Sequence, residues 1–161
     1  MRQALESFGY VVVVHRIGRP QHFIDVLAGD TITQFDYVII ACHGADNGAI
    51  IMPELGDSVY YSDEPRGNFG PQEIGRYLAL KDTCIIGYGC FLGQKDAAKA
   101  FAKNHNVYIA PKDEVDGSSG LVFIILLFCY LACSKHKMDI KAAYKKVSKL
   151  DSEIGLFMYY E

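Results

Sequence analysis

The feature that most constrains the fold is a set of short, continuous runs of β-branched and other apolar residues. A strand buried on both faces of a sheet is apolar at successive positions, whereas a half-exposed strand alternates apolar and polar residues. Segments with a helical spacing of apolar residues separate these runs, which is typical of a mostly parallel sheet covered by helices. The sequence therefore predicts an α/β protein, built as a three-layer α/β/α sandwich. The expected strands are residues 10–14, 37–41, 83–87, 106–110 and 156–160.

The length of the chain limits the number of domains that it can form. A chain of 161 residues fits one domain with its own core, and no linker or low-complexity tract divides it. We therefore expect a single α/β domain over residues 1–161. Residues 1–9 look like the end of a helix that usually follows a first strand. Either the fold is trimmed on its N-terminal side, so that this strand is missing, or an upstream segment completes it.

Composition and charge argue against several partners and locations. The formal net charge is −3 and no basic run is present, so nothing predicts nucleic-acid binding. The longest apolar run, residues 121–133, is shorter than the roughly 20 residues that span a membrane, and the N-terminus has no signal-peptide core. The five cysteines are odd in number and show no disulfide framework, which is typical of reduced thiols. We therefore expect a cytoplasmic protein that binds neither nucleic acid nor a membrane.

Two reactive side chains follow expected strands. His43 comes after residues 37–41, Cys90 comes after residues 83–87, and each has a glycine beside it. Because ligands of open α/β sheets bind beyond the carboxyl ends of the strands, these two positions are suited to a shared site. A histidine can take the proton of a cysteine that attacks a carbonyl group. The backbone amides of Gly44 and Cys90 are the expected oxyanion donors.

These residues stand within motifs that resemble the caspase-like (clan CD) cysteine peptidases, in particular their CHAT-type branch. The motifs are Val-Ile-Ile-Ala-Cys-His-Gly at residues 38–44 and Ile-Ile-Gly-Tyr-Gly-Cys at residues 85–90. His43 precedes Cys90 by roughly 50 positions, as in caspases. The resemblance covers nearly the whole chain, about residues 10–161. It implies a caspase-like sheet and a dyad that cleaves a peptide or protein substrate, with His43 as base and Cys90 as nucleophile. It implies no metal and no cofactor.

Two positions depart from the pattern of that family. Relatives often carry a small pair such as Ser-Gly after the cysteine, whereas Phe-Leu follows Cys90 here. Basic-specific relatives often have an acidic residue two positions before the cysteine, where this chain has Tyr88. The candidate substrate-binding residues are Tyr88, Asp113 and Asp116, since the two carboxylates could bind a basic side chain. A solvated acidic loop is the alternative interpretation of the carboxylates.

The remaining cysteines are interpreted as packing residues. Cys42 should point away from the dyad, since side chains alternate along a strand, and Cys84 lies within an expected strand. Cys129, Cys133 and His136 share one face of an expected helix. Three residues lack the fourth ligand of a structural zinc site, so helix packing is expected and no metal is predicted.

Two alternatives stay open beside the peptidase. One is a catalytically inactive caspase-like module that acts as a protein-binding or regulatory domain, with a regulatory protein as its partner. The unusual residues after Cys90 favour it. The other is an amidotransferase-like hydrolase, in which the histidine would follow the cysteine in the chain. Neither His105 nor His136 stands at the end of an expected strand. The sequence predicts no oligomeric state.

Overall fold

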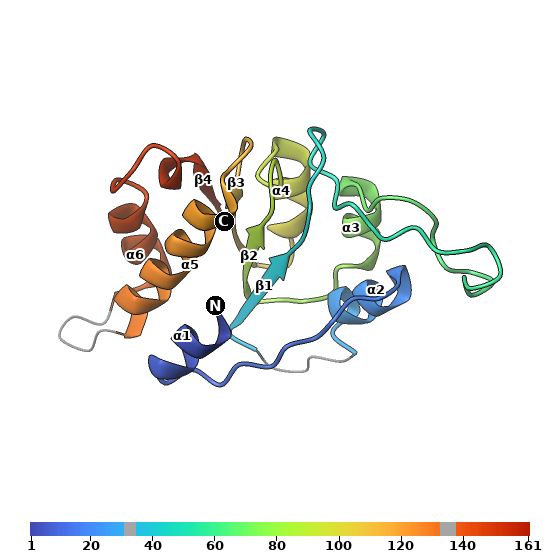
Figure 1. The fold of residues 1–161 in the computed structure, drawn as a ribbon, viewed down its shortest axis with the longest axis horizontal. Coiled ribbons are helices and arrows are strands. Elements are labelled where there is room, and N and C mark those ends of the chain that lie inside the picture. The colour runs from blue at the N-terminus through green and yellow to red at the C-terminus, as the bar shows by residue number, and fades with distance from the viewer. Residues whose placement is uncertain (31–34, 133–137) are drawn as a thin grey trace.

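The computed structural model describes residues 1–30, 35–132 and 138–161 and shows a mixed α/β fold (Figure 1). The strands are β1 (Tyr37–Ala41), β2 (Cys84–Tyr88), β3 (Val107–Pro111) and β4 (Phe157–Tyr160). The six helices of the described residues are α1 (Arg2–Ser7), α2 (Pro20–Ala28), α3 (Pro71–Tyr77), α4 (Lys95–Phe101), α5 (Gly117–Ala132) and α6 (Ile140–Val147). A short 3-10 helix, η1 (Ile154–Leu156), precedes β4. No helix within these described ranges combines the length and the apolar character that crossing a membrane requires.

The four strands form one open sheet in the order β1-β2-β3-β4. The first three strands are parallel, whereas β4 runs antiparallel to β3. The connections between the parallel strands pass through α3 and α4, as parallel pairing requires a crossover. The prediction of an α/β protein with a mostly parallel sheet is therefore confirmed. The carboxyl ends of β1 and β2 point to the upper edge of the molecule in Figure 1.

Side chains leave the sheet toward two separate groups of helices. The α4-side cluster forms where α2, α3 and α4 pack on the sheet, and the α5-side cluster forms where α1, α5 and α6 pack on it. β2 serves both, since Ile85 belongs to the first cluster and Ile86 to the second, and both are fully buried. The α4-side cluster includes Phe23, Leu27, Ile74, Ala98, Phe101 and Tyr108. The α5-side cluster includes Leu5, Phe123, Leu127, Ala143, Val147 and Phe157.

The predicted strand at residues 10–14 is wrong, because this segment pairs with no strand of the sheet. Val11 and Val13 are 88% and 66% exposed, while Tyr10 and Val12 pack against the α5-side cluster. Residues 10–13 thus keep the two-residue alternation of a strand without its hydrogen bonds, whereas Val14 is exposed. The amides of residues 11–17 donate no backbone hydrogen bond within the described ranges. A β-branched run forms a strand only where a neighbouring strand offers its edge.

Candidate active site

β1 and β2 end at the same level, which brings the residues that follow them together. Ala41 is paired with Tyr88 at the end of the ladder, and the Cys42 amide donates to the Tyr88 carbonyl at 3.1 Å. His43 and Cys90 each stand two residues beyond that last pair. Matching positions on adjacent parallel strands are neighbours across the sheet. Both residues therefore lie at the carboxyl edge of the sheet, where open α/β sheets bind ligands.

Side-chain alternation assigns the same two residues to one face of the sheet. Cys42 packs against the α4-side cluster, whereas Cys90 packs against the α5-side cluster. Since successive side chains point to opposite faces, His43 projects to the face that holds Cys90. His43 is exposed and Cys90 is partly buried. An imidazole and a thiol are thus presented on one side of the rim, and Cys42 lies on the other side, as the sequence predicts.

Two glycines allow the strand ends to touch through their backbones. A β-carbon built on Gly44 would lie 1.9 Å from the Cys90 carbonyl oxygen. A β-carbon built on Gly89 would lie 2.5 Å from the Cys42 carbonyl oxygen. Each glycine therefore packs directly against the backbone of the other segment, an approach that only a residue without a side chain allows. The turn after His43 and the turn at Cys90 form one packed unit.

The Cys90 thiol faces the start of α5. Its sulfur lies 3.7 Å from the Val115 carbonyl oxygen and donates a hydrogen bond to it. Tyr88, on the same face, fastens this region, because its hydroxyl donates to the Gly117 carbonyl at 2.6 Å. A β-carbon on Gly120 would lie 2.6 Å from the Tyr88 ring, so the ring packs closely on α5. Tyr88 thus holds the helix beside the thiol, and contact of Tyr88 with a substrate stays a prediction.

The chain turns sharply after Cys90. Phe91 has a φ of 60°, in the left-handed region that bulky residues rarely adopt. Its amide donates to the Asp113 carbonyl, and its own carbonyl accepts from the Gln94 amide. α4 begins only at Lys95, so this turn separates the thiol from the helix. Residues with strained backbones cluster at functional sites, and no sequence signal at Phe91 predicted this conformation.

Two backbone amides at this rim have no hydrogen-bond acceptor among the described residues. Among the described residues, neither the Gly44 amide nor the Cys90 amide donates a hydrogen bond to the protein. Unoccupied amides beside a nucleophile can stabilise the negative oxygen of a tetrahedral intermediate. The oxyanion hole stays a prediction, and both of its assigned donors are unoccupied by protein acceptors.

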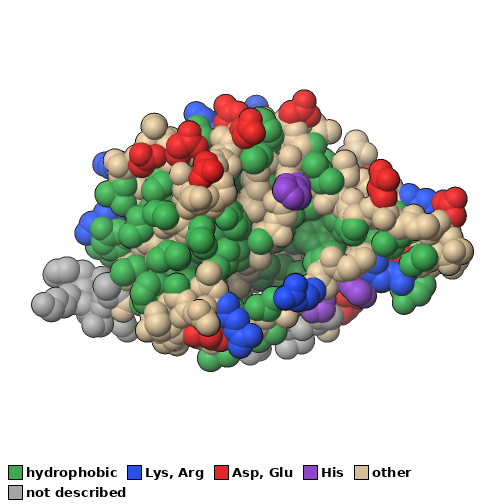
Figure 2. All heavy atoms as spheres, viewed as in Figure 1, with side chains coloured by type: hydrophobic (Ala, Val, Ile, Leu, Met, Phe, Trp, Pro, Cys, Tyr) green, Lys and Arg blue, Asp and Glu red, His purple; other side chains and the backbone are tan. Residues whose placement is uncertain are grey.

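The acidic candidates lie in the loop between β3 and α5. Asp116 caps α5, because its carboxylate accepts hydrogen bonds from the amides of Ser119 and Ser118, which lower its pKa. The Asp113 carboxylate accepts from the Glu114 amide. Figure 2 shows acidic side chains gathered along the edge of the molecule to which the strands point. The Asp116 carboxylate therefore has a local structural role, and substrate binding by Asp113 or Asp116 stays a prediction.

The other thiols lie in surroundings unlike that of Cys90. Burial raises the pKa of Cys42 to about 12, and the neighbouring Cys90 adds to this rise. Burial alone raises the pKa of Cys84 to about 12. Because the thiolate is the reactive form, neither Cys42 nor Cys84 is suited to act as a nucleophile near neutral pH.

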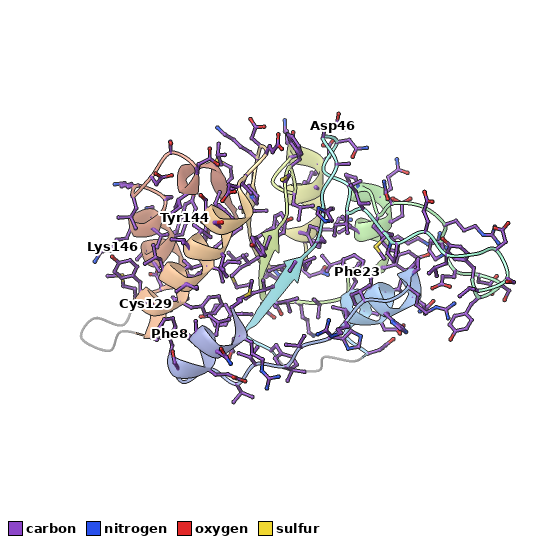
Figure 3. All side chains as sticks on the ribbon, in the orientation of Figure 1. Phe8, Phe23, Asp46, Cys129, Tyr144 and Lys146 are labelled. Atoms are coloured by element: carbon purple, nitrogen blue, oxygen red, sulfur yellow. The ribbon has the colours of Figure 1, made fainter. Side chains whose placement is uncertain are left out.

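Of the three residues Cys129, Cys133 and His136, which are interpreted above as helix packing, the structure describes only the first. Cys129 lies on α5, on the side where Phe8 follows α1 (Figure 3). Cys133 and His136 lie outside the described residues. In the ranges that the structure describes, His, Cys, Asp and Glu side chains form no group of three or more able to hold a metal ion.

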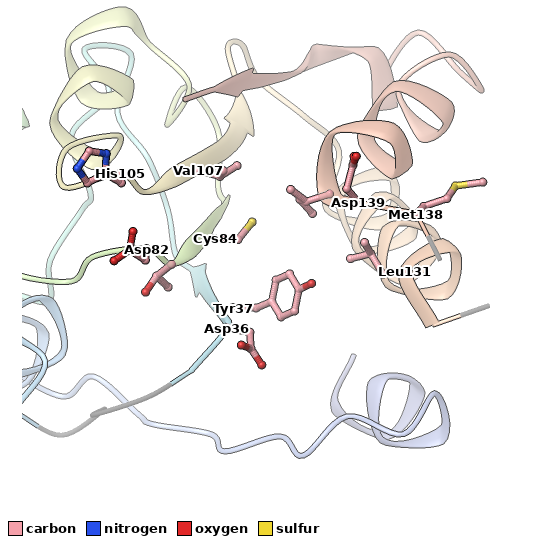
Figure 4. A pocket seen from close by; sticks show the side chains of 11 residues that line it. Asp36, Tyr37, Asp82, Cys84, His105, Val107, Leu131, Met138 and Asp139 are labelled. Atoms are coloured by element: carbon pink, nitrogen blue, oxygen red, sulfur yellow. The ribbon is translucent and has the colours of Figure 1, made fainter. Parts of the chain in front are cut away.

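A cavity of about 270 Å³ lies at the opposite end of the sheet, where β2 and β3 begin (Figure 4). Cys84 and Val107 form part of its apolar wall, and Asp36, Asp82 and Asp139 also line it. Neither residue of the predicted dyad reaches it, because both stand at the other ends of the strands. The cavity is therefore separate from the candidate active site.

Comparison of the chain with models of protein families, with curated proteins and with solved structures found no match. The chemical groups at the carboxyl edge of the sheet are therefore the basis for assigning a function. This edge presents an exposed imidazole, a partly buried thiol and two unoccupied amides on adjoining turns. These are the groups that acyl transfer through a thioester requires.

Proposed function

We propose that this chain is a thiol-dependent peptidase with a three-layer, caspase-like α/β/α domain and a His43/Cys90 dyad. The observation that carries the proposal is the backbone contact between the two strand ends, where Gly44 packs on Cys90 and Gly89 packs on Cys42. Two strand ends without a shared site need no close backbone contact. The two residues of a catalytic dyad, in contrast, must be held at a fixed separation. Side-chain alternation, which assigns His43 to the face that holds Cys90, supports the same conclusion.

In the proposed reaction, the Cys90 sulfur attacks the carbonyl carbon of a peptide bond while His43 takes the thiol proton. A carbon–sulfur bond forms, and the carbonyl oxygen becomes an oxyanion beside the amides of Gly44 and Cys90. The carbon–nitrogen bond then breaks as His43 gives the proton to the leaving amine, which leaves a thioester on Cys90. Water attacks the thioester and gives a proton to His43, and the carbon–sulfur bond then breaks as His43 returns that proton to the sulfur. The products are a carboxylic acid, an amine and the regenerated thiol.

Two substitutions test the proposal. Cys90→Ala and His43→Ala should each abolish cleavage of peptides in a randomised mixture, followed by mass spectrometry. Cys84→Ala is the matched control, because it removes a buried thiol outside the dyad. The Cys84→Ala protein should still cleave the peptides. Circular dichroism would show that every variant keeps the fold. Cleavage that survives Cys90→Ala would exclude Cys90 as the nucleophile.

A second candidate is a caspase-like module that binds a protein partner and cleaves nothing. The hydrogen bond from the Cys90 thiol to the Val115 carbonyl favours it, since the thiol then contacts the backbone of the protein itself. Alkylation separates the two candidates, because a catalytic thiol beside an imidazole reacts as its thiolate. Iodoacetamide at neutral pH, with each cysteine followed by peptide mapping, should modify Cys90 fastest if the chain is a peptidase. A rate for Cys90 no higher than that for Cys129 would favour the binding module.

A further inference from the structure

The chain after His43 forms a tight hairpin that returns to it. The Ala45 amide donates to the Ala49 carbonyl at 2.8 Å, and the Ile51 amide donates to the His43 carbonyl at 2.9 Å. These two bonds flank an antiparallel bridge between Gly44 and Ile50. In such a pairing, Ile51 stands directly opposite His43, and the side chains of opposite residues share a face.

The two isoleucines of the returning arm have different surroundings. Ile50 is 2% exposed and belongs to the α4-side cluster, so its side chain points into the protein. Ile51 is the next residue, so it projects to the other face, where His43 also projects. Ile51 is 45% exposed. A large apolar side chain thus stands beside the imidazole with much of its surface open to solvent.

The hairpin holds this side chain in a fixed position. Ile50 forms two backbone hydrogen bonds with Phe69, each of 2.9 Å. At the hairpin turn, a β-carbon on Gly48 would lie 3.0 Å from the side chains of Ala97 and Gln94, so the turn rests on α4. Figure 3 shows the tip, marked by Asp46, at the upper edge of the molecule. Apolar surface on a rigid frame binds with little loss of conformational entropy.

The position of Ile51 beside His43 places it next to the part of a substrate that follows the cleaved bond. In the reaction proposed above, the imidazole gives its proton to the leaving amine, so the leaving segment passes along His43. The first side chain of that segment then lies over the residue next to the imidazole. We propose that Ile51 is a specificity-determining residue, which selects peptides with a large apolar residue immediately after the cleaved bond. This inference rests on the proposed peptidase function.

Cleavage of a mixture of short peptides with randomised sequence tests the inference, with cut sites identified by mass spectrometry. The unmodified protein should enrich Leu, Ile, Met and Phe directly after the cut by about 5- to 10-fold over Ser and Asp, a range suited to a partly exposed apolar contact. Ile51→Ser should reduce this enrichment to about 2-fold or less. Leu150→Ser is the matched control, because Leu150 is 54% exposed but follows α6, and it should leave the enrichment unchanged.

The outcomes separate the inference from the function on which it rests. Cuts that disappear with Cys90→Ala and lose their apolar preference with Ile51→Ser would support both. Cuts that depend on Cys90 but keep the same preference with Ile51→Ser would overturn the role of Ile51 alone. Absence of any Cys90-dependent cut would overturn the peptidase proposal and this inference with it. Thermal unfolding of the Ile51→Ser protein would show that it is folded in the assay.

Discussion

Of the two glycines at the strand ends, Gly44 leaves less room for a side chain, since an added β-carbon would overlap the Cys90 carbonyl oxygen. Gly44 does not have a positive φ, so other residues could adopt its backbone angles. What excludes a side chain there is space, since the atom in its way belongs to the backbone of a packed turn. Backbone cannot rotate aside as the end of a flexible side chain can. Gly44 therefore couples the position of His43 to that of Cys90.

Gly44→Ala should lower the free energy of unfolding by about 3 kcal/mol, because the new methyl group must push the two strand ends apart. Urea unfolding followed by circular dichroism measures this change. Gly56→Ala is the matched control, since its nearest neighbour, a Val59 methyl group, lies at an ordinary 3.9 Å. It should change the free energy by less than about 0.5 kcal/mol. Equal stability of the two variants would contradict the packed contact at Gly44.

Among the connecting elements, the long segment between β1 and α3 is fastened by one carboxylate. The Glu64 side chain is fully buried and accepts two hydrogen bonds from the Arg19 guanidinium. It also accepts one hydrogen bond each from the backbone amides of Gln21 and Tyr61. Arg19 is the N-cap residue of α2 and also stacks on the Tyr61 ring at 3.4 Å. Glu64 thus ties a long loop to the start of a helix.

Glu64→Gln should lower the free energy of unfolding by about 3 kcal/mol, because it leaves the largely buried Arg19 guanidinium without its counter-charge. Thermal or urea unfolding would measure the loss. Asp57→Asn in the same loop is the control, since the Asp57–Arg66 pair is exposed and such pairs contribute about 0–1 kcal/mol. A Glu64→Gln protein as stable as Asp57→Asn would show that the carboxylate does not fasten the loop.

The same carboxylate predicts a pH dependence. The hydrogen bond from Arg19 is the main cause that lowers the pKa of Glu64 from 4.5 to about 2. A depressed pKa in the folded state stabilises the protein above the unfolded value, and this contribution is lost as the pH falls from about 4.5 toward 2. Urea unfolding at a series of pH values should show this loss in the unmodified protein. The loss should be smaller in Glu64→Gln; identical pH profiles would contradict the assignment.

At the scale of the whole molecule, β1 is an edge strand of the four-stranded sheet, and residues 10–14 lie outside the sheet. β2 lies between two parallel partners and contributes side chains to both clusters. Stability against local opening follows such pairing and burial. The centre of the sheet and the N-terminal extended segment should therefore differ sharply in their opening free energies.

Hydrogen–deuterium exchange measures this difference. The amides of β2 should exchange slowest, whereas the amides of residues 11–17 should exchange within the shortest labelling times, since no protein acceptor in the described ranges protects them. The amides of α5 provide an internal reference for a buried helix. Slow exchange at residues 11–14 would show that this valine-rich segment is paired in solution.

The strands that flank the candidate site could be predicted from the sequence because they are continuously apolar. β1 coincides with residues 37–41, and β2 and β3 differ from their predicted ranges by one residue at each end. The residues of the dyad could be chosen because reactive side chains beside glycines follow two of these strands. Three features of the site could not be predicted: the hydrogen bond of Cys90 to the Val115 carbonyl, the φ of Phe91 and the exposure of Ile51. They are properties of a backbone path or of a neighbour distant in the chain.

The sequence by itself determined which segments are apolar enough to be buried and which side chains can carry out chemistry at their ends. These properties belong to single residues and short runs, so hydrophobic periodicity reveals them. Only the tertiary structure decided that the valine-rich residues 10–14 stay outside the sheet and that His43 and Cys90 share one face. Strand pairing joins groups far apart in the chain, and its register depends on every neighbour at once.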